Sequence, residues 1–182
     1  MSVFSIHRIA SAALANSGTV VVAAAALVLL AAPPSLARPA WDDSPIHVER
    51  SVKPQPKVVD MRVGAHQNFD RVVIDLDGKV PGYDVRYRRH LSYDGSGDRV
   101  PLKGRKFIAI ALFPAKAHDR HGHDVYAGPD LQQYSQFDTL RGAAFLGDFE
   151  GYVTLGLSLR HRADFRVTVL HASNRIVIDL QH

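Results

Sequence analysis

The stretches "DMRVGAHQNFDRVVIDL" (Asp60 to Leu76) and "DFRVTVLHASNRIVIDL" (Asp164 to Leu180) align over 17 positions without a gap and are identical at eight. The first copy places Val72, Ile74 and Leu76 on one side of an extended chain and charged residues on the other. Such alternation with a period of two is typical of a β-strand with one buried face. Each copy reads as strand, turn, strand. The sequence therefore predicts two similar β-hairpins related by pseudo-symmetry.

The charged positions of the two copies correspond as well. Arginine and aspartate lie on the face opposite the aliphatic row, so we expect them to form cross-strand ion pairs. Pairs exposed to solvent contribute only about 0 to 1 kcal/mol, so they fix strand register more than stability. The residues concerned are Arg62, Arg71 and Asp75 in the first copy, and Arg166, Arg175 and Asp179 in the second.

The remainder of the chain also favours strands over helices. "YDVRYRR" (Tyr83 to Arg89) alternates, whereas "FIAIALF" (Phe107 to Phe113) is apolar on both faces and is expected at the centre of a sheet. A short helical turn is expected after Pro129, and no long amphipathic helix is found. The predicted fold class is all-β, a small β-sandwich or partly closed barrel. Further strands are expected near Phe137 to Leu146, Tyr152 to Arg160, Phe165 to Leu170 and Arg175 to Leu180.

The N-terminal segment has the features of an export signal. Arg8 precedes an apolar run from Thr19 to Ala32, and small residues lead to a cleavage position after Ala37. Residues 1–37 are therefore expected to be a signal peptide, and the chain to be exported to an extracellular or cell-wall location. Membrane attachment is expected only if this segment stays uncleaved. Residues 38–57 hold four prolines and Trp41 and predict an extended linker; the β domain is predicted over residues 58–182.

Composition argues against several classes of activity. The chain has no cysteine, which excludes disulfides and thiol nucleophiles. Its net charge is +4 and no run of lysines occurs, so nucleic acid is not an expected partner. Asp148 and Glu150 are the nearest pair of carboxylates for glycosidase chemistry, yet "GDFEG" is typical of a hairpin turn. We expect no enzyme activity and no cofactor.

"AHDRHGHDVY" (Ala117 to Tyr126) is the densest group of possible metal ligands. It contains His118, His121 and His123, and imidazoles in a loop can bind zinc, nickel or copper. The spacing matches no closed metal site, which favours an exposed polar loop. Metal binding by these three histidines stays as an alternative.

The segment after Gly82 is the best candidate for ligand binding. Tyrosine rings can stack on sugars, and arginines can bind carboxylates or phosphates by two hydrogen bonds. Strand alternation places Tyr83 and Tyr87 on the face opposite Arg86 and Arg88. The two tyrosines are therefore expected in the core if the arginines face solvent. Phe69, Phe145, Phe149 and Tyr152 are expected to be packing residues. The candidate ligand-binding residues are Arg86, Arg88, Arg89, Tyr83, Tyr87 and Tyr93.

The order of these motifs resembles a known family. "RVVIDL" in an early strand and "RIVIDL" in a terminal strand resemble the AMIN and AMIN-like domains of bacterial envelope proteins. "FDRVVIDLDGKVPGYDVRY", "DGSGDRVPLKG", "FPAKAHD", "YAGP" and "GDFEGYVTLGLSLR" are similar to the AMIN-like domains of secreted actinobacterial proteins. The resemblance implies a small β-sandwich that binds cell-wall polymer, namely peptidoglycan. An alternative is a protein-interaction adaptor, in which an envelope protein docks on Arg175 to Leu180 as an exposed edge strand.

Overall fold

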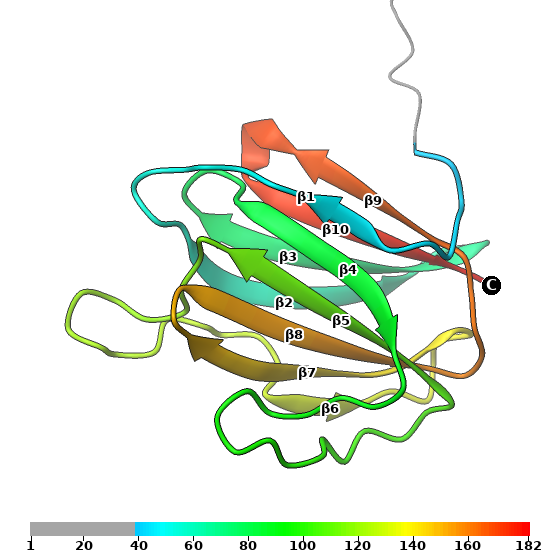
Figure 1. Ribbon diagram of the computed structural model, residues 1–182. Helices are drawn as coiled ribbons and strands as arrows, with labels where there is room; N and C mark the ends of the chain where they lie inside the picture. Colours follow the sequence, from blue (N-terminus) through cyan, green and yellow to red (C-terminus); the bar gives the residue numbers. More distant parts are fainter. Residues whose placement is uncertain (1–38) are drawn as a thin grey trace, which may run out of the picture. The chain divides into compact units, whose positions relative to one another are not determined.

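Two antiparallel sheets, packed face to face, make up the computed structural model, which describes residues 39–182 (Figure 1). The expected signal peptide, residues 1–37, lies outside the described residues. Among the described residues no helix is long and apolar enough to span a membrane. The elements are β1 (Ile46–Val48), β2 (Lys57–Ala65), β3 (Phe69–Asp77), β4 (Gly82–Arg88), β5 (Lys106–Phe113), β6 (Leu131–Gln133), β7 (Leu140–Phe149), β8 (Tyr152–Leu159), β9 (Phe165–Leu170), the 3-10 turn η1 (His171–Ser173) and β10 (Arg175–Gln181).

The larger sheet has the strand order β1-β4-β5-β8-β7-β6 and the smaller one β2-β3-β10-β9. The main core lies between them and is built from the inward rows of both sheets, such as Ile108 and Ile110 of β5 and Ile74 of β3. This arrangement confirms the predicted small β-sandwich and the central place of β5. No closed barrel is formed by residues 39–182. The helical turn expected after Pro129 is wrong, because β6 follows there and η1 lies between β9 and β10.

The two copies of the repeated 17-mer form most of the smaller sheet. The first copy covers most of β2 and β3, and the second covers β9 and β10, so the predicted hairpins are confirmed. Their innermost strands pair antiparallel with Val73 opposite Val177. These two valines occupy equivalent positions in the repeat, so the pseudo-twofold axis passes between them.

The predicted cross-strand ion pairs are present on the outward face of this sheet. Asp75 accepts from Arg62 at 2.7 Å and from Arg175 at 2.6 Å, and Asp179 accepts from both equivalent arginines. The second set is not at the surface, however, because Asp179 is only 1% exposed. The expectation that all of these pairs are surface pairs is therefore wrong for Asp179.

The terminal strand is not an edge strand. β10 lies between β3 and β9 and is hydrogen-bonded on both sides. The proposed docking on Arg175 to Leu180 is thus excluded by the topology. The prediction failed because the repeat shows which strands form a hairpin, but not which strands of two hairpins meet.

Part of the proline-rich segment, residues 39–57, packs on the sandwich. β1 extends the larger sheet by pairing with β4, and Asp42 forms a backbone bridge to Phe165. The guanidinium of Arg166 lies over the ring of Trp41, 4.0 Å from the ring centroid. The ring centroids of Trp41 and Phe69 are 6.1 Å apart. Trp41 therefore packs over Arg166 and Phe69 on the outward face of the smaller sheet, and Arg166 in turn donates to the buried Asp179.

A second, smaller apolar cluster lies on the outer face of the larger sheet. The long connection between β4 and β5 folds across this face, and its Leu91, Val100 and Leu102 pack on Phe107 and Leu146. Only part of the outer face is covered in this way. The uncovered part lies where Asp84 of β4, Ala111 of β5 and Thr154 of β8 are neighbours.

Candidate binding site on the outer sheet face

Small side chains form the uncovered part of the outer face. Ala109 and Ala111 point outward from β5, and the strand register places Ala111 between Asp84 of β4 and Thr154 of β8. Two hollows lie here, one of about 460 Å³ that includes Ala111 and one of about 380 Å³ that includes Ala109 and Thr154. We call this surface the outer-face site. Its residues are His47, Glu49, Asp84, Arg86, Arg88, Arg89, Ala109, Ala111, Phe113, Tyr152 and Thr154.

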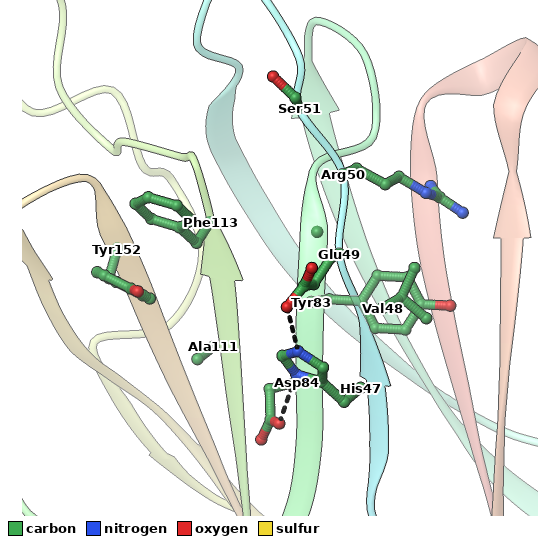
Figure 2. A pocket seen from close by; sticks show the side chains of 11 residues that line it. His47, Val48, Glu49, Arg50, Ser51, Tyr83, Asp84, Ala111, Phe113 and Tyr152 are labelled. Carbon is green, nitrogen blue, oxygen red and sulfur yellow. Dashed lines mark hydrogen bonds and ion pairs between the residues drawn. The ribbon is translucent and has the colours of Figure 1, made fainter.

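Exposed aromatic rings stand at one end of the outer-face site. Phe113 and Tyr152 are each 46% exposed, and their rings stack with centroids 4.3 Å apart and planes at 22° (Figure 2). Phe149 pairs with Tyr152 across the β7–β8 turn and is 62% exposed. Flat apolar faces presented to water are suited to stacking against the C–H face of a sugar ring.

Hydrogen-bonding groups form the side wall opposite these rings. His47 of β1 lies between two carboxylates, with Nδ1 3.2 Å from Asp84 Oδ2 and Nε2 3.4 Å from Glu49 Oε1 (Figure 2). Arg86 lies two residues after Asp84 on the same face of β4. Its guanidinium donates to both carboxylate oxygens of Asp84. These hydrogen bonds hold the pKa of Asp84 below its ordinary value, although burial acts in the opposite direction. Asp84 therefore stays an ionised acceptor at neutral pH.

The predicted arginines lie along the outer-face site as expected from the alternation. Arg86 is half-exposed and forms an ion pair with Asp84, whereas Arg88 and Arg89 are exposed beside the second hollow. The wall is nearly balanced in charge, because Arg86 offsets Asp84. Arg88 and Arg89 lie at the end where β4 leaves the sheet, and Arg50 borders the larger hollow at the aromatic end.

The three predicted tyrosines do not join this surface as stacking rings. Tyr83 is buried on the opposite side of β4, and Tyr87 is held from the same side by bonds to the backbone of Ala163. Tyr87 donates to the carbonyl of Ala163 at 2.7 Å and accepts from its N–H at 3.0 Å. Tyr93 packs beside the smaller apolar cluster. Tyr83 and Tyr87 therefore face the core side of β4, as the strand alternation suggested, although Tyr83 also borders the larger hollow.

Sequence reasoning missed the three aromatic rings that the surface does present, those of Phe113, Phe149 and Tyr152. Phe149 and Tyr152 were expected to be packing residues, and their exposure shows that this expectation is wrong. Both flank a tight turn in which Glu150 and Gly151 have positive φ of 51° and 82°, so their side chains project beyond the core. Phe113 has the same parity as Ala109 and Ala111 in β5, and this pattern of small, small, aromatic was the available signal.

The histidine loop does not gather a metal site within residues 39–182. His118 Nδ1 lies 2.5 Å from Asp148 Oδ2, and His123 Nδ1 lies 3.3 Å from Asp119 Oδ2. His121 accepts a hydrogen bond from Arg120 instead. No group of three or more ligating side chains comes together in the described part of the chain.

The fold and this surface define an all-β sandwich with one open, partly aromatic sheet face, which is typical of a binding domain. Residues 56–182 match the family model of the AMIN-like domain, and because the match covers more than half of the chain, the protein belongs to the AMIN-like domain family. Domains of this family occur in envelope-associated proteins and are generally non-catalytic binding domains. Comparison with curated proteins and with solved structures gave no match.

Proposed function

We propose that this protein is an exported, non-catalytic domain that binds the glycan of peptidoglycan at the outer-face site. One observation carries the proposal: the stacked, exposed rings of Phe113 and Tyr152 stand beside a wall of ionised hydrogen-bonding groups over a floor of alanines. Stacking rings and fixed polar groups that converge on one hollow are the usual composition of a ligand site. Membership of the AMIN-like family supports peptidoglycan as the polymer.

The charges of the outer-face site favour the sugar backbone over the acidic peptide stems at its aromatic end. Glu49 and Asp84 border the hollow there, the guanidinium of Arg86 is engaged by Asp84, and that of Arg50 lies over the ring of Tyr83. Carboxylates accept hydrogen bonds from sugar hydroxyls and repel other carboxylates. The exposed Arg88 and Arg89, near the second hollow, are the groups suited to an acidic substituent.

Sedimentation with purified sacculi tests the proposal. The Phe113→Ala/Tyr152→Ala variant is expected to lose most of the bound fraction, since stacking on one ring contributes about 1 kcal/mol or more. Leu131→Ala/Leu170→Ala removes exposed apolar groups from other strands and serves as the matched control. Arg88→Ala/Arg89→Ala tests the arginine end separately. Retention of the aromatic double variant at the level of the control would reject the outer-face site.

Docking of a protein on a strand edge is less well supported. The true edges are β1, β6, β2 and β9. β1 and β6 have three residues each, and β2 is covered at its start by hydrogen bonds with the chain around Lys116. Short or covered edges resist strand addition. The metal-binding alternative likewise lacks a converging ligand set among residues 39–182.

A further inference from the structure

Four cationic side chains surround a hollow of about 510 Å³ at the end of the larger sheet opposite the aromatic rings. They are Lys103, Arg105, Arg141 and Arg160, and Gly104 completes the lining. β5 runs from this end to Phe113, so eight residues at about 3.3 Å each place the hollow more than about 20 Å from the aromatic pair. This surface, which we call the basic end, is therefore separate from the outer-face site.

Backbone hydrogen bonds bring the four residues together from three segments. Arg105 N–H donates to the carbonyl of Leu159 at 2.8 Å, and Arg160 N–H donates to that of Thr139 at 2.9 Å. Leu140 and Lys106 both pair with Leu159, so the starts of β5 and β7 meet the end of β8. The positions of the cations are set by the sheet.

The segment that carries two of the cations is packed closely on β8. A Cβ on Gly104 would lie 2.8 Å from Cβ of Ser158, so only glycine fits at that place. The hydroxyl of Ser158 also donates to the carbonyl of Lys103 at 3.0 Å. Lys103 and Arg105 thus project from a fixed backbone on either side of a glycine.

Among residues 39–182 these cations form no ion pair, a feature they share with exposed arginines such as Arg88 and Arg89. Six arginines elsewhere form ion pairs with aspartate: Arg62, Arg71, Arg86, Arg162, Arg166 and Arg175. At the basic end no ion pair is formed within residues 39–182, and Arg141 donates only to the carbonyl of Ser135, at 3.3 Å. Four like charges held together by the backbone repel one another, and an anion relieves that repulsion.

We propose that the basic end binds a phosphate-bearing ligand with at least two negative charges. Three guanidinium groups offer paired donors that match phosphate oxygens, and Lys103 adds a compact positive charge. A single carboxylate would leave most of this charge unbalanced. The proposal does not depend on glycan binding at the outer-face site.

Isothermal titration of the full chain with pyrophosphate tests the site, with binding measured at low and at physiological ionic strength. Arg105→Ala/Arg160→Ala is expected to weaken binding by at least about tenfold, because each charged hydrogen bond lost contributes that much. Lys79→Ala/Arg120→Ala removes the same charge from exposed positions outside both sites and should leave the affinity within about twofold. Both double variants alter exposed side chains, and their unfolding midpoints verify that they fold.

A second variant and a second ligand source complete the test. Lys103→Glu should abolish pyrophosphate binding, since it places a negative charge beside the ligand. Flotation with vesicles that contain cardiolipin, whose headgroup carries two phosphodiesters, shows the source: binding lost in Arg105→Ala/Arg160→Ala indicates a lipid phosphate, and absence of vesicle binding indicates a soluble or polymer-borne phosphate. The proposal is overturned if wild type does not bind pyrophosphate, or if both double variants weaken binding equally.

Discussion

Val73 and Val177 lie opposite one another where β3 meets β10, and each is the other's counterpart in the repeated 17-mer. Equivalent contacts must therefore occur twice. Arg71 donates to Asp179 at 2.6 Å, and Arg175 donates to Asp75 at 2.6 Å, across the same strand pair in opposite directions. The repeat thus supplies two chemically equal ion-pair sets in different surroundings.

The two sets should differ in their contribution to stability. Asp179→Asn is expected to lower the free energy of unfolding by about 3 kcal/mol, because it leaves the enclosed Arg166 without its carboxylate. Asp75→Asn should cost only about 1 kcal/mol, since Arg62 and Arg175 are about half exposed and can be solvated. Urea unfolding of both variants measures the difference.

Asp77→Asn provides the control for these substitutions. Its ion pair with Lys57 is exposed, so a change within about 0.5 kcal/mol is expected. Equal losses for Asp75→Asn and Asp179→Asn would contradict the stronger burial of the second set.

The same carboxylates should make stability depend on acidity. Burial acts to raise the pKa of Asp179, but hydrogen bonds from Arg71 and Arg166 outweigh it and hold the pKa below its ordinary value. Burial and two arginines act on Asp75 in the same way, and its pKa is also lowered. Such groups contribute stability that is present above the unfolded pKa of about 3.9 and is lost as the pH falls through the lowered folded value.

Unfolding free energy measured from pH 6 downward should therefore fall steeply below about pH 4. The Asp75→Asn/Asp179→Asn variant is less stable at neutral pH and should show a shallower fall in that acidic range. Parallel curves for the variant and wild type would contradict the assignment of the lowered pKa values.

Trp41 should stabilise the domain although it precedes the segment that matches the family model. Trp41→Ala removes the ring from Arg166 and Phe69, and the expected loss is about 1 to 2 kcal/mol. Leu131→Ala, which alters an exposed side chain of β6, is the control. A loss no larger than that of the control would mean that residues before β1 are detached from the sandwich.

Tyr87 should act through its hydroxyl. Tyr87→Phe leaves the N–H of Ala163 without its acceptor and the carbonyl without its donor, at a cost of about 1 to 2 kcal/mol. Tyr152→Phe alters an exposed ring at the outer-face site and should leave stability unchanged. Thermal unfolding compares them; equal midpoints would contradict the structural role of Tyr87.

The repeat and the strand alternation were sufficient to predict the sandwich, both hairpins and the central place of β5. They could not show that β10 is central, because pairing between hairpins depends on contacts far apart in sequence. The packing of Trp41 on Arg166, a partner of Asp179, was also hidden, since Trp41 comes from an apparently unstructured segment. Period-two patterns give the face of a residue but not what covers that face.

Prediction of the site was partial for a related reason. The outward direction of Arg86 and Arg88 followed from the alternation in β4, and so did the inward direction of Tyr83. His47 was missed because β1 is three residues long and its period cannot be recognised. The rings of Phe113 and Tyr152 meet only because β5 and β8 are neighbours, which no local pattern shows.

The most direct test of the account is a backbone amide NMR titration of the protein with peptide-free, N-acetylated glycan oligomers. The account predicts shift changes concentrated at Ala111, Phe113, Tyr152 and Thr154, and their loss in Phe113→Ala/Tyr152→Ala. Changes concentrated on the outward face of β3 and β10, or unchanged in that variant, would contradict glycan binding at the outer-face site.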